Sequence, residues 1–247
     1  MKQQNIIKQN SLIFGKFSSA YKETDLDIVN TLILNLQNAR REGGELLNLL
    51  NYDALIKNKI NITSFNIRKN SNIKEVSNSD IFKILKNIRD ISVILSNFTD
   101  YIFIDGKEEK ITYKFKTLSI IDSVGMNEAA DGRTENYEII FNPLFLKLTL
   151  SDFNKKVGNH TIITLSDVTS LSSKHAKRLY ESILSRKKLK NFTLNHENLN
   201  SIFGLKNKPW SYAKRTFLRQ IEKIKPLIYF KFEIHDFDKK ISIEIVE

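Results

Sequence analysis

The chain has 247 residues, no cysteine and a formal net charge of +11, and this excess of cations favours a polyanion as its partner. Hydrophobic residues make up 41% of the chain, which is enough to build one large domain or two small ones. The missing cysteines exclude disulfides and thiolate metal sites, and since the chain shows no long apolar run, we expect neither a signal peptide nor a membrane-spanning segment. The net charge allows a polyanion or an anionic membrane surface, and of these two partners we expect the polyanion and no membrane.

The first part of the chain is predicted to fold as helices followed by strands. Apolar residues recur at helical spacing over 25–40, where Thr24 is the expected N-cap, and again over 79–95. Short helical pieces are predicted between them, at 46–50 and 54–56. The polar side of the helix at 79–95 carries three cations and an amide, Lys83, Lys86, Asn87 and Arg89.

The helices are followed by a predicted antiparallel sheet. Alternating apolar and polar residues indicate strands at 101–105, 111–124 and 137–148. A turn at 106–110 joins the first two strands, and a polar segment at 125–136 is predicted to be a long hairpin loop.

A second cycle of elements follows. Its predicted order is a strand and Ser-rich helix start over 161–173, a helix over 174–188, a very short strand at 192–194, helices over 195–205 and 206–224, and two strands within 227–247. Asn195 is the expected N-cap of the helix over 195–205, and Gly204 is its expected C-terminal signal. A helix-turn-helix followed by a two-stranded wing is the order of a winged helix.

The predicted fold class is therefore α+β, with two tandem winged-helix domains in which helices pack on a small antiparallel sheet. Residues 1–148 are assigned to the first domain and residues 149–247 to the second, with the joint near 149–156. The first domain holds 20 Lys and Arg against 18 Asp and Glu, and the second holds 19 against 10. We therefore expect the main sequence-specific DNA contact in the second domain, and dimerisation, DNA contact or both in the first.

The helix over 206–224 is amphipathic and is the expected recognition helix. Its apolar side carries Trp210, Ala213, Phe217, Ile221 and Ile224, so that the single tryptophan is predicted to lie in the core. The residues assigned to DNA on this helix are Ser211, Tyr212, Lys214, Arg215 and Arg219. The alternative for this surface is a cationic face that is merely solvated.

Other cations of the second domain are predicted to contact the phosphate backbone or to contribute a general positive field. They are Lys174, Lys177, Arg178, Lys206, Lys208, Lys239 and Lys240, together with the neighbouring pair Lys187 and Lys188. Ser172 and Ser173 offer amides at a helix start, which is a natural seat for a phosphate. In the first domain, Asp80 and Asp90 lie beside the cations of the helix at 79–95 and weaken the case for a DNA contact there.

The residues that usually carry catalysis are scattered. His160, His175, His196 and His235 have no metal-ligand spacing, and the paired His-x-His site of a rolling-circle nickase is missing from the sequence. No nucleotide-binding glycine motif occurs either. We therefore expect no catalytic, metal or cofactor residues and no enzymatic activity.

One stretch resembles a known family. "LTLSDVTSLSSKHAKRLYESILSRKK" is similar to the signature of iteron-binding plasmid replication initiators of the RepA/RepE type. The matching positions are Leu171, Ser173, Lys174, Ala176, Arg178, Leu179, Tyr180, Glu181 and Leu184. The stretch "FTLNHENLNSIFGL" and the following "WSYAKRTFLRQIEKI" are similar to the family's helix-turn-helix, and the likeness covers residues 135–247 best.

The resemblance implies a bacterial cytoplasmic protein without enzymatic activity. Such a protein binds repeated origin DNA as a monomer, helps to melt adjacent AT-rich DNA, recruits the host helicase and host initiator, and represses its own gene as a dimer. The remaining alternatives are a winged-helix transcriptional repressor, an origin nickase, and a structural or purely protein-binding role. The residues themselves predict only a basic, two-module DNA-binding protein.

Overall fold

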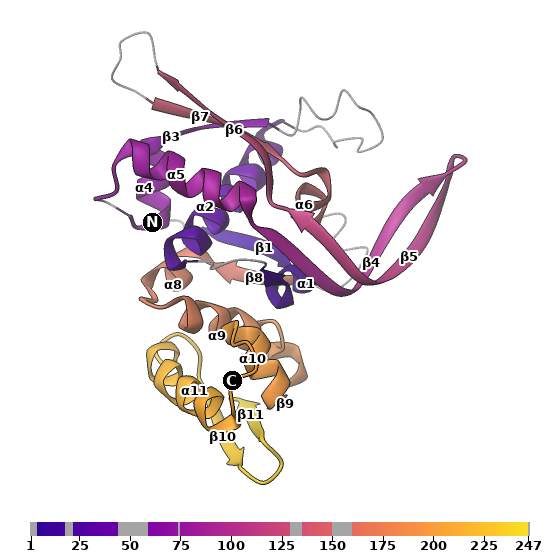
Figure 1. The fold of residues 1–247 in the computed structure, drawn as a ribbon, viewed down its shortest axis with the longest axis vertical. Coiled ribbons are helices and arrows are strands. Elements are labelled where there is room, and N and C mark those ends of the chain that lie inside the picture. The colour runs from indigo at the N-terminus through magenta and orange to yellow at the C-terminus, as the bar shows by residue number, and fades with distance from the viewer. Residues whose placement is uncertain are drawn as a thin grey trace. The chain divides into compact units, whose positions relative to one another are not determined.

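The protein forms two compact units, Met1–Leu165 and Ser166–Glu247 (Figure 1). The computed structural model describes residues 4–17, 22–43, 59–73, 75–128, 135–149 and 160–246. The short helical pieces predicted at 46–50 and 54–56 lie outside the described residues.

The first unit combines helices with three small antiparallel sheets. Its helices are α1 (Asn10–Phe14), α2 (Glu23–Gly43), α4 (Ser64–Ser71), α5 (Asn78–Asp90) and α6 (Pro143–Leu148). Its strands are β1 (Asn5–Gln9), β2 (Lys16–Phe17), β3 (Lys59–Thr63), β4 (Ser92–Ile104), β5 (Lys107–Ser119), β6 (Ile121–Glu128), β7 (Glu135–Phe141) and β8 (His160–Thr164). The sheets have the strand orders β1-β8, β2-β4-β5 and β3-β7-β6.

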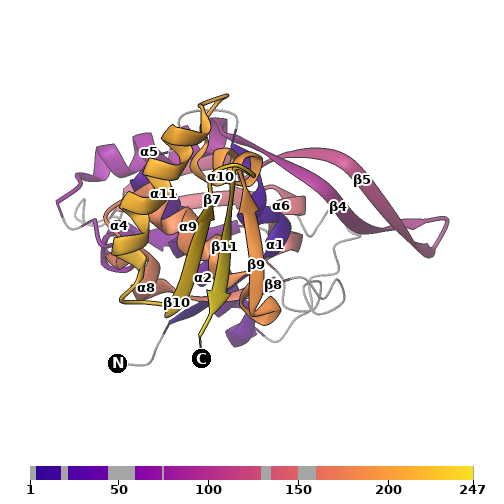
Figure 2. The same cartoon turned by 90° about the horizontal axis from the view of Figure 1, so that it is seen from below.

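The second unit contains four helices and one sheet. Its elements are α8 (Leu165–Ser170, which begins at the last residue of the first unit), α9 (Lys174–Leu184), the 3-10 turn η1 (Lys187–Leu189), β9 (Asn191–Asn195), α10 (His196–Phe203), α11 (Trp210–Ile224), β10 (Phe230–His235) and β11 (Lys240–Ile245). Figure 2 shows β10, β11 and β9 side by side, in the order that their hydrogen bonds give. This is the predicted sequence of elements, with a β10–β11 hairpin as the wing.

Both units repeat one connectivity. In the first, the order α2, β3, α4, α5, β6, β7 builds a sheet β3-β7-β6; in the second, the order α9, β9, α10, α11, β10, β11 builds a sheet β9-β11-β10. The first unit differs in having the long β4–β5 hairpin inserted after α5. The α+β class with helices on small antiparallel sheets is confirmed. In this shared connectivity, α5 of the first unit corresponds to α11 of the second.

Local sequence accounts for most helix ends. The Ser77 side chain accepts a hydrogen bond from the Asp80 amide at the start of α5. Asn195 and Asn198 form a reciprocal capping box at the start of α10, and Gly204 ends that helix with φ of 64°, a conformation that glycine adopts without strain. The predicted cap at Asn195 and stop at Gly204 are both confirmed.

Two predicted helix ends are wrong. The helix predicted over 79–95 ends at Asp90, because Val93 and Leu95 are buried as alternate residues of β4 and pair with β5. Tertiary pairing thus overrides an apolar spacing that also fits a helix. Thr24 lies inside α2, which begins one residue earlier, and the Lys22 amide donates to the carboxylate of Asp25 at 2.8 Å.

The division between the units lies at Leu165, later than the predicted boundary at residue 148. β8 pairs antiparallel with β1, with Asn5 opposite Thr164. The Thr161 hydroxyl also donates to the Asn10 side-chain oxygen at 2.7 Å. The strand that the sequence assigns to the second domain therefore completes a sheet of the first unit.

The core of the second unit forms where α11 packs against α9, α10 and the sheet. Ala213, Phe217, Ile221 and Ile224 are fully buried, as predicted, and the Phe217 ring meets the edge of Phe232 with centroids 5.4 Å apart. The prediction for Trp210 is wrong, since this side chain is only half-buried and its indole N–H donates to Asp236 at 2.7 Å.

We predict that Phe217→Ala lowers the free energy of unfolding of the second unit by about 3–5 kcal/mol, because it leaves a cavity beneath α11. Leu218→Ala is the matched control, since this neighbour is 39% exposed and its truncation opens no closed cavity. Denaturant unfolding followed by circular dichroism measures both. Equal losses for the two variants would contradict the assignment of Phe217 to the core.

Candidate nucleic-acid interface

The exposed side of α11 carries the cations that sequence analysis assigned to DNA. Ser211, Arg215 and Arg219 are exposed, while Tyr212 and Lys214 are half-buried. The opposite side of the helix is buried in the core, so the helix is fixed with this side outward. All five side chains therefore belong to one elongated surface that starts at the N-terminus of α11.

Tyr212 organises the first turn of this surface. The guanidinium of Arg215 lies 5.4 Å from the centre of the tyrosine ring, and the ammonium of Lys208 lies 5.8 Å from it. Both distances are within the range of a cation–π interaction. The ring thus holds two cations close together beside a phenolic hydroxyl that can donate to a base or a phosphate.

Asp236, in the β10–β11 turn, connects the wing to α11. Its carboxylate accepts hydrogen bonds from the Trp210 indole at 2.7 Å and from the Lys214 ammonium at 2.8 and 2.9 Å. These two donors, the lysine first, hold the pKa of Asp236 below its usual range. Lys214 is consequently less available for DNA than the prediction assumed, and its clearest role is to fix the wing.

A second group of cations gathers at the start of α9. Burial, together with the charges of Lys174, Arg219 and Arg178, lowers the pKa of His175 from 6.5 to about 4. The charges of these three cations all act on His175, so Arg219 of α11 lies within electrostatic range of the first turn of α9. The Lys223 ammonium also donates to the Ser172 hydroxyl at 3.4 Å, so the predicted phosphate seat at Ser172 adjoins the recognition helix.

Two of the predicted phosphate contacts on α9 require correction. Lys177 is fully buried, because the helix packs this side against the unit, and it cannot belong to an exposed cationic surface. Arg178 is half-buried, and its Nε donates to the backbone oxygen of Ile202 at 2.7 Å, which ties α9 to α10. Lys174 is half-buried and remains at the edge of the α11 surface.

The remaining predicted contacts differ in how they are held. Lys206, Lys208 and Lys239 are exposed, on the loop before α11 and on the wing turn. Lys240 is half-buried and forms an ion pair of 2.7 Å with Asp238. Lys187 and Lys188 are exposed on the turn η1.

In the first unit, α5 presents a weaker cationic face than the sequence spacing predicted. Lys83 pairs with Asp80 at 2.9 Å, and Arg89 pairs with Asp90 at 2.9 Å. Lys86 lies over the ring of Phe82, and Asn87 is exposed. The four residues do lie together outside the apolar side of the helix, but neighbouring carboxylates offset two of the three charges.

The loop before α11 is held by residues that the sequence pattern did not indicate. The His196 ring nitrogen and the Asn200 amide both lie within hydrogen-bond distance of the Lys208 backbone oxygen, at 2.8 and 3.3 Å. The His196 ring also meets Trp210 edge-on, with centroids 6.0 Å apart. The contact between Trp210 and Asp236 is not indicated by the sequence pattern either. Local patterns contain no signal for these contacts, since each joins residues at least eight positions apart.

The signature around "KRLYESIL" is largely a packing motif. Leu179 and Tyr180 are buried, and the Tyr180 hydroxyl donates to the Asp167 carboxylate at 3.1 Å. Burial, followed by the nearby Asp167 charge, raises the pKa of Tyr180 above its usual value, so the hydroxyl stays protonated as a donor. The main role of the motif is thus to position α9 beneath the α11 surface, because its buried residues pack inside the unit.

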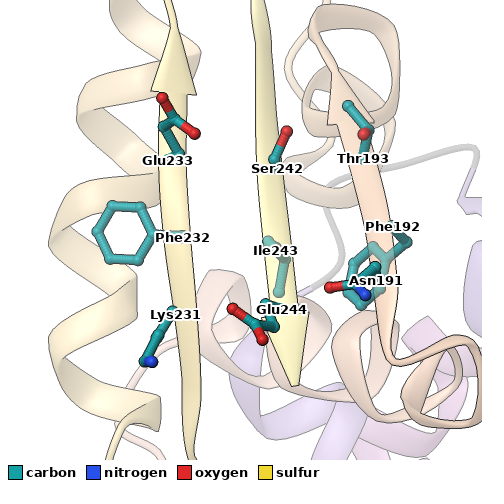
Figure 3. Close-up of a pocket in the computed structure, with 9 residues that line it drawn as sticks. All are labelled: Asn191, Phe192, Thr193, Lys231, Phe232, Glu233, Ser242, Ile243 and Glu244. Carbon is teal, nitrogen blue, oxygen red and sulfur yellow. The ribbon is translucent and has the colours of Figure 1, made fainter. Parts of the chain in front are cut away.

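The outer face of the three-stranded sheet carries a pocket of about 530 Å³ (Figure 3). Its polar lining consists of Asn191, Thr193, Lys231, Glu233, Ser242 and Glu244. Two carboxylates against one ammonium make this surface a poor match for phosphates, in contrast to the surface around α11.

The described residues contain neither a metal-binding cluster nor a membrane-spanning helix. Within them, no group of three or more His, Asp or Glu side chains could hold a metal ion. No helix of the described ranges has the length and apolar character that crossing a membrane requires. The α11 surface is therefore the clearest candidate site in this part of the chain.

The low pKa of His175 makes the stability of the second unit depend on pH. Protonation of this ring is disfavoured in the folded state, so we predict that the free energy of unfolding falls as the pH drops from 6.5 towards 4. His175→Gln should reduce this dependence. Denaturant unfolding at several pH values measures it, and an NMR signal of His175 that titrates near 6.5 would contradict it.

Comparison with known proteins identifies the fold but not the family. No family model matches the sequence, and a search of curated proteins finds no relative. Among solved structures, the Pi initiator protein in complex with iteron DNA is similar over 100% of this chain and 99% of its own, with a TM-score of 0.53 and 15% identity.

Domains 2 and 3 of RctB are a second structural neighbour. They match 91% of this chain and 82% of their own length, with a TM-score of 0.51 and 14% identity. At such low identity the likeness concerns architecture alone. The chain therefore has the α+β fold of these two proteins, and over its whole length that of the Pi initiator protein.

Proposed function

We propose that this protein is a plasmid replication initiator that binds repeated origin DNA sequence-specifically through α11. The observation that carries the proposal is the outward surface of that helix, where Tyr212, Arg215 and Arg219 join the cations at the start of α9. Support for the target comes from the Pi initiator protein, whose fold this chain shares and whose structure contains iteron DNA.

In this proposal α11 enters the major groove. Arg215 and Arg219 lie four residues apart and so on the same side of the helix, and a guanidinium can pair with two acceptors of one guanine. Lys206, Lys208 and Lys174 lie at the edge of this surface, where they would contact phosphates and set the orientation of the helix. Serine hydroxyls and the Tyr212 hydroxyl supply neutral donors.

The proposal also includes the properties that the sequence resemblance implies. They are opening of AT-rich DNA, recruitment of host helicase and initiator, repression of the protein's own gene as a dimer, a bacterial cytoplasmic location and the absence of enzymatic activity. The first unit would contribute either a second DNA contact through α5 or a dimer surface. Incubating the protein with supercoiled origin DNA and Mg²⁺ tests the proposed absence of enzymatic activity, since relaxed circles would indicate an origin nickase.

We predict that Arg215→Ala and Arg219→Ala each weaken binding to the cognate repeat by about 1–3 kcal/mol and weaken binding to scrambled DNA much less. A footprint on origin DNA identifies the repeat, and electrophoretic mobility shifts measure the affinities. Lys231→Ala is the matched control, because this exposed cation lies on the outer face of the sheet. Equal losses on both DNAs would mean that the arginines contact phosphate only.

For the first unit, we predict that Lys86→Gln reduces the slope of log K against log salt by about one, as loss of a phosphate contact does. Lys83→Gln is the control, since Asp80 already neutralises that ammonium at 2.9 Å. Fluorescence anisotropy over a salt series gives both slopes. An unchanged slope for Lys86→Gln would remove α5 from the DNA and leave dimerisation as the role of this unit.

A further inference from the structure

The tip of the wing exposes an aromatic side chain completely. Phe237 is 99% exposed, the highest value among the large hydrophobic side chains of the described residues. It lies in the turn between β10 (Phe230–His235) and β11 (Lys240–Ile245), two strands that Figure 1 labels. A single exposed apolar residue is ordinary by itself, so its surroundings decide whether it has a role.

The turn that carries Phe237 is fixed on both sides. The Asp236 carboxylate is bound by Trp210 and Lys214 of α11. On the other side, the Lys239 backbone oxygen accepts a hydrogen bond from the His196 amide at 3.0 Å. The tip is therefore held against the beginnings of α11 and α10, and Phe237 projects from a position that is defined relative to the recognition helix.

The turn itself does not need a phenylalanine. Its polar neighbours make the chain reversal, with the Lys239 amide donating to the Asp236 backbone oxygen at 3.3 Å and Lys239 in the left-handed region at φ of 49°. Turns favour Gly, Asn, Asp or Ser, whose side chains suit water. Contact of the exposed apolar ring with water is unfavourable, and a partner that covers the ring would remove this surface from water.

The charges around the tip suit a polyanion. Asp236 is paired with Lys214, and Asp238 with Lys240, so both carboxylates are offset by ammonium groups. Lys239 adds a further exposed cation. The tip thus combines one apolar ring with a net positive charge, and it adjoins the end of α11 that bears Tyr212 and Arg215.

We propose that Phe237 is a wedge that enters the minor groove beside the major groove occupied by α11 and unstacks one base step. This inference rests on the proposed function, and it adds a residue that deforms the DNA instead of reading its bases. Apolar side chains inserted in this way kink a duplex towards the major groove, and unstacking is least costly at flexible pyrimidine–purine steps. The wedge would therefore add specificity for a deformable step at positions that α11 does not touch.

The test uses the full chain and a 30-base-pair duplex, which is about three helical turns long. The duplex carries the repeat that the protein selects from a random-sequence pool. Fluorescence energy transfer between the labelled ends reports bending, and 2-aminopurine placed under the wing reports unstacking. The wild-type protein should raise both signals. Phe237→Ala should lose both, whereas Phe237→Leu should keep most of the bend, because leucine also serves as a wedge.

A mismatch placed at the wedged step separates deformation from simple contact. The mismatch removes part of the unstacking cost, so it should tighten wild-type binding by about tenfold and change binding of Phe237→Ala little. Tyr229→Ala is the matched control, since Tyr229 is 66% exposed but precedes β10 at the opposite end of the hairpin. It should leave bending and affinity unchanged.

The experiment distinguishes failure of the wedge from failure of the proposed function. If the full chain selects no duplex from the pool, the proposed function fails and the wedge fails with it. If the chain binds its repeat and Phe237→Ala bends and unstacks the DNA as the wild type does, only the wedge is overturned. In that case the exposed ring would be assigned to a protein partner or to solvent.

Discussion

The amphipathic character of α11 is the constraint on which the second unit depends. Ala213, Phe217, Ile221 and Ile224 are fully buried against the other helices and the sheet, and this packing fixes the rotation of the helix about its axis. With that rotation fixed, Ser211, Arg215 and Arg219 face outward, whereas Thr216 and Gln220 are buried beside the apolar residues. The same apolar packing that stabilises the unit therefore determines which side chains are presented to a ligand.

Polar contacts then position the neighbouring elements relative to this helix. Asp236 joins the wing to the first turn of α11, while His196 and Asn200 hold the loop that precedes it. Only the Asp236 bonds involve a charged group, and such bonds contribute more than neutral ones, although solvent at this exposed end weakens the pair with Lys214. Helix, loop and wing turn consequently form one connected surface.

The two units show how one architecture can carry different electrostatics. α5 and α11 have the same place in the connectivity, yet Asp80 and Asp90 pair with cations of α5, while Arg215 is held by a tyrosine ring. Stacking on a ring leaves the guanidinium charge in place, whereas an ion pair offsets it. This difference leaves the outward face of α11 more cationic than that of α5, in line with the distribution of charge along the chain.

Much of the fold could be predicted because its signals are local. Helical spacing, the cap at Asn195 and the stop at Gly204 depend on residues within one or two turns of each other. The outward side of α11 could be predicted for the same reason. Where local signals were ambiguous, as at Val93 and Leu95, the spacing fitted both a helix and a strand, and only the partner strand β5 selected the strand.

The sequence by itself thus determined the second cycle of elements, the α+β class and the basic outward face of α11, but it missed β3 and α4 and predicted a strand over the residues of α6. Tertiary structure alone decided that β8 completes a sheet of the first unit, that Lys177 is buried and that Trp210 binds Asp236. The physical reason is separation along the chain. A periodic pattern shows which side of an element is apolar, but the partner that covers a side chain can lie many residues away, and only the folded chain brings the two together.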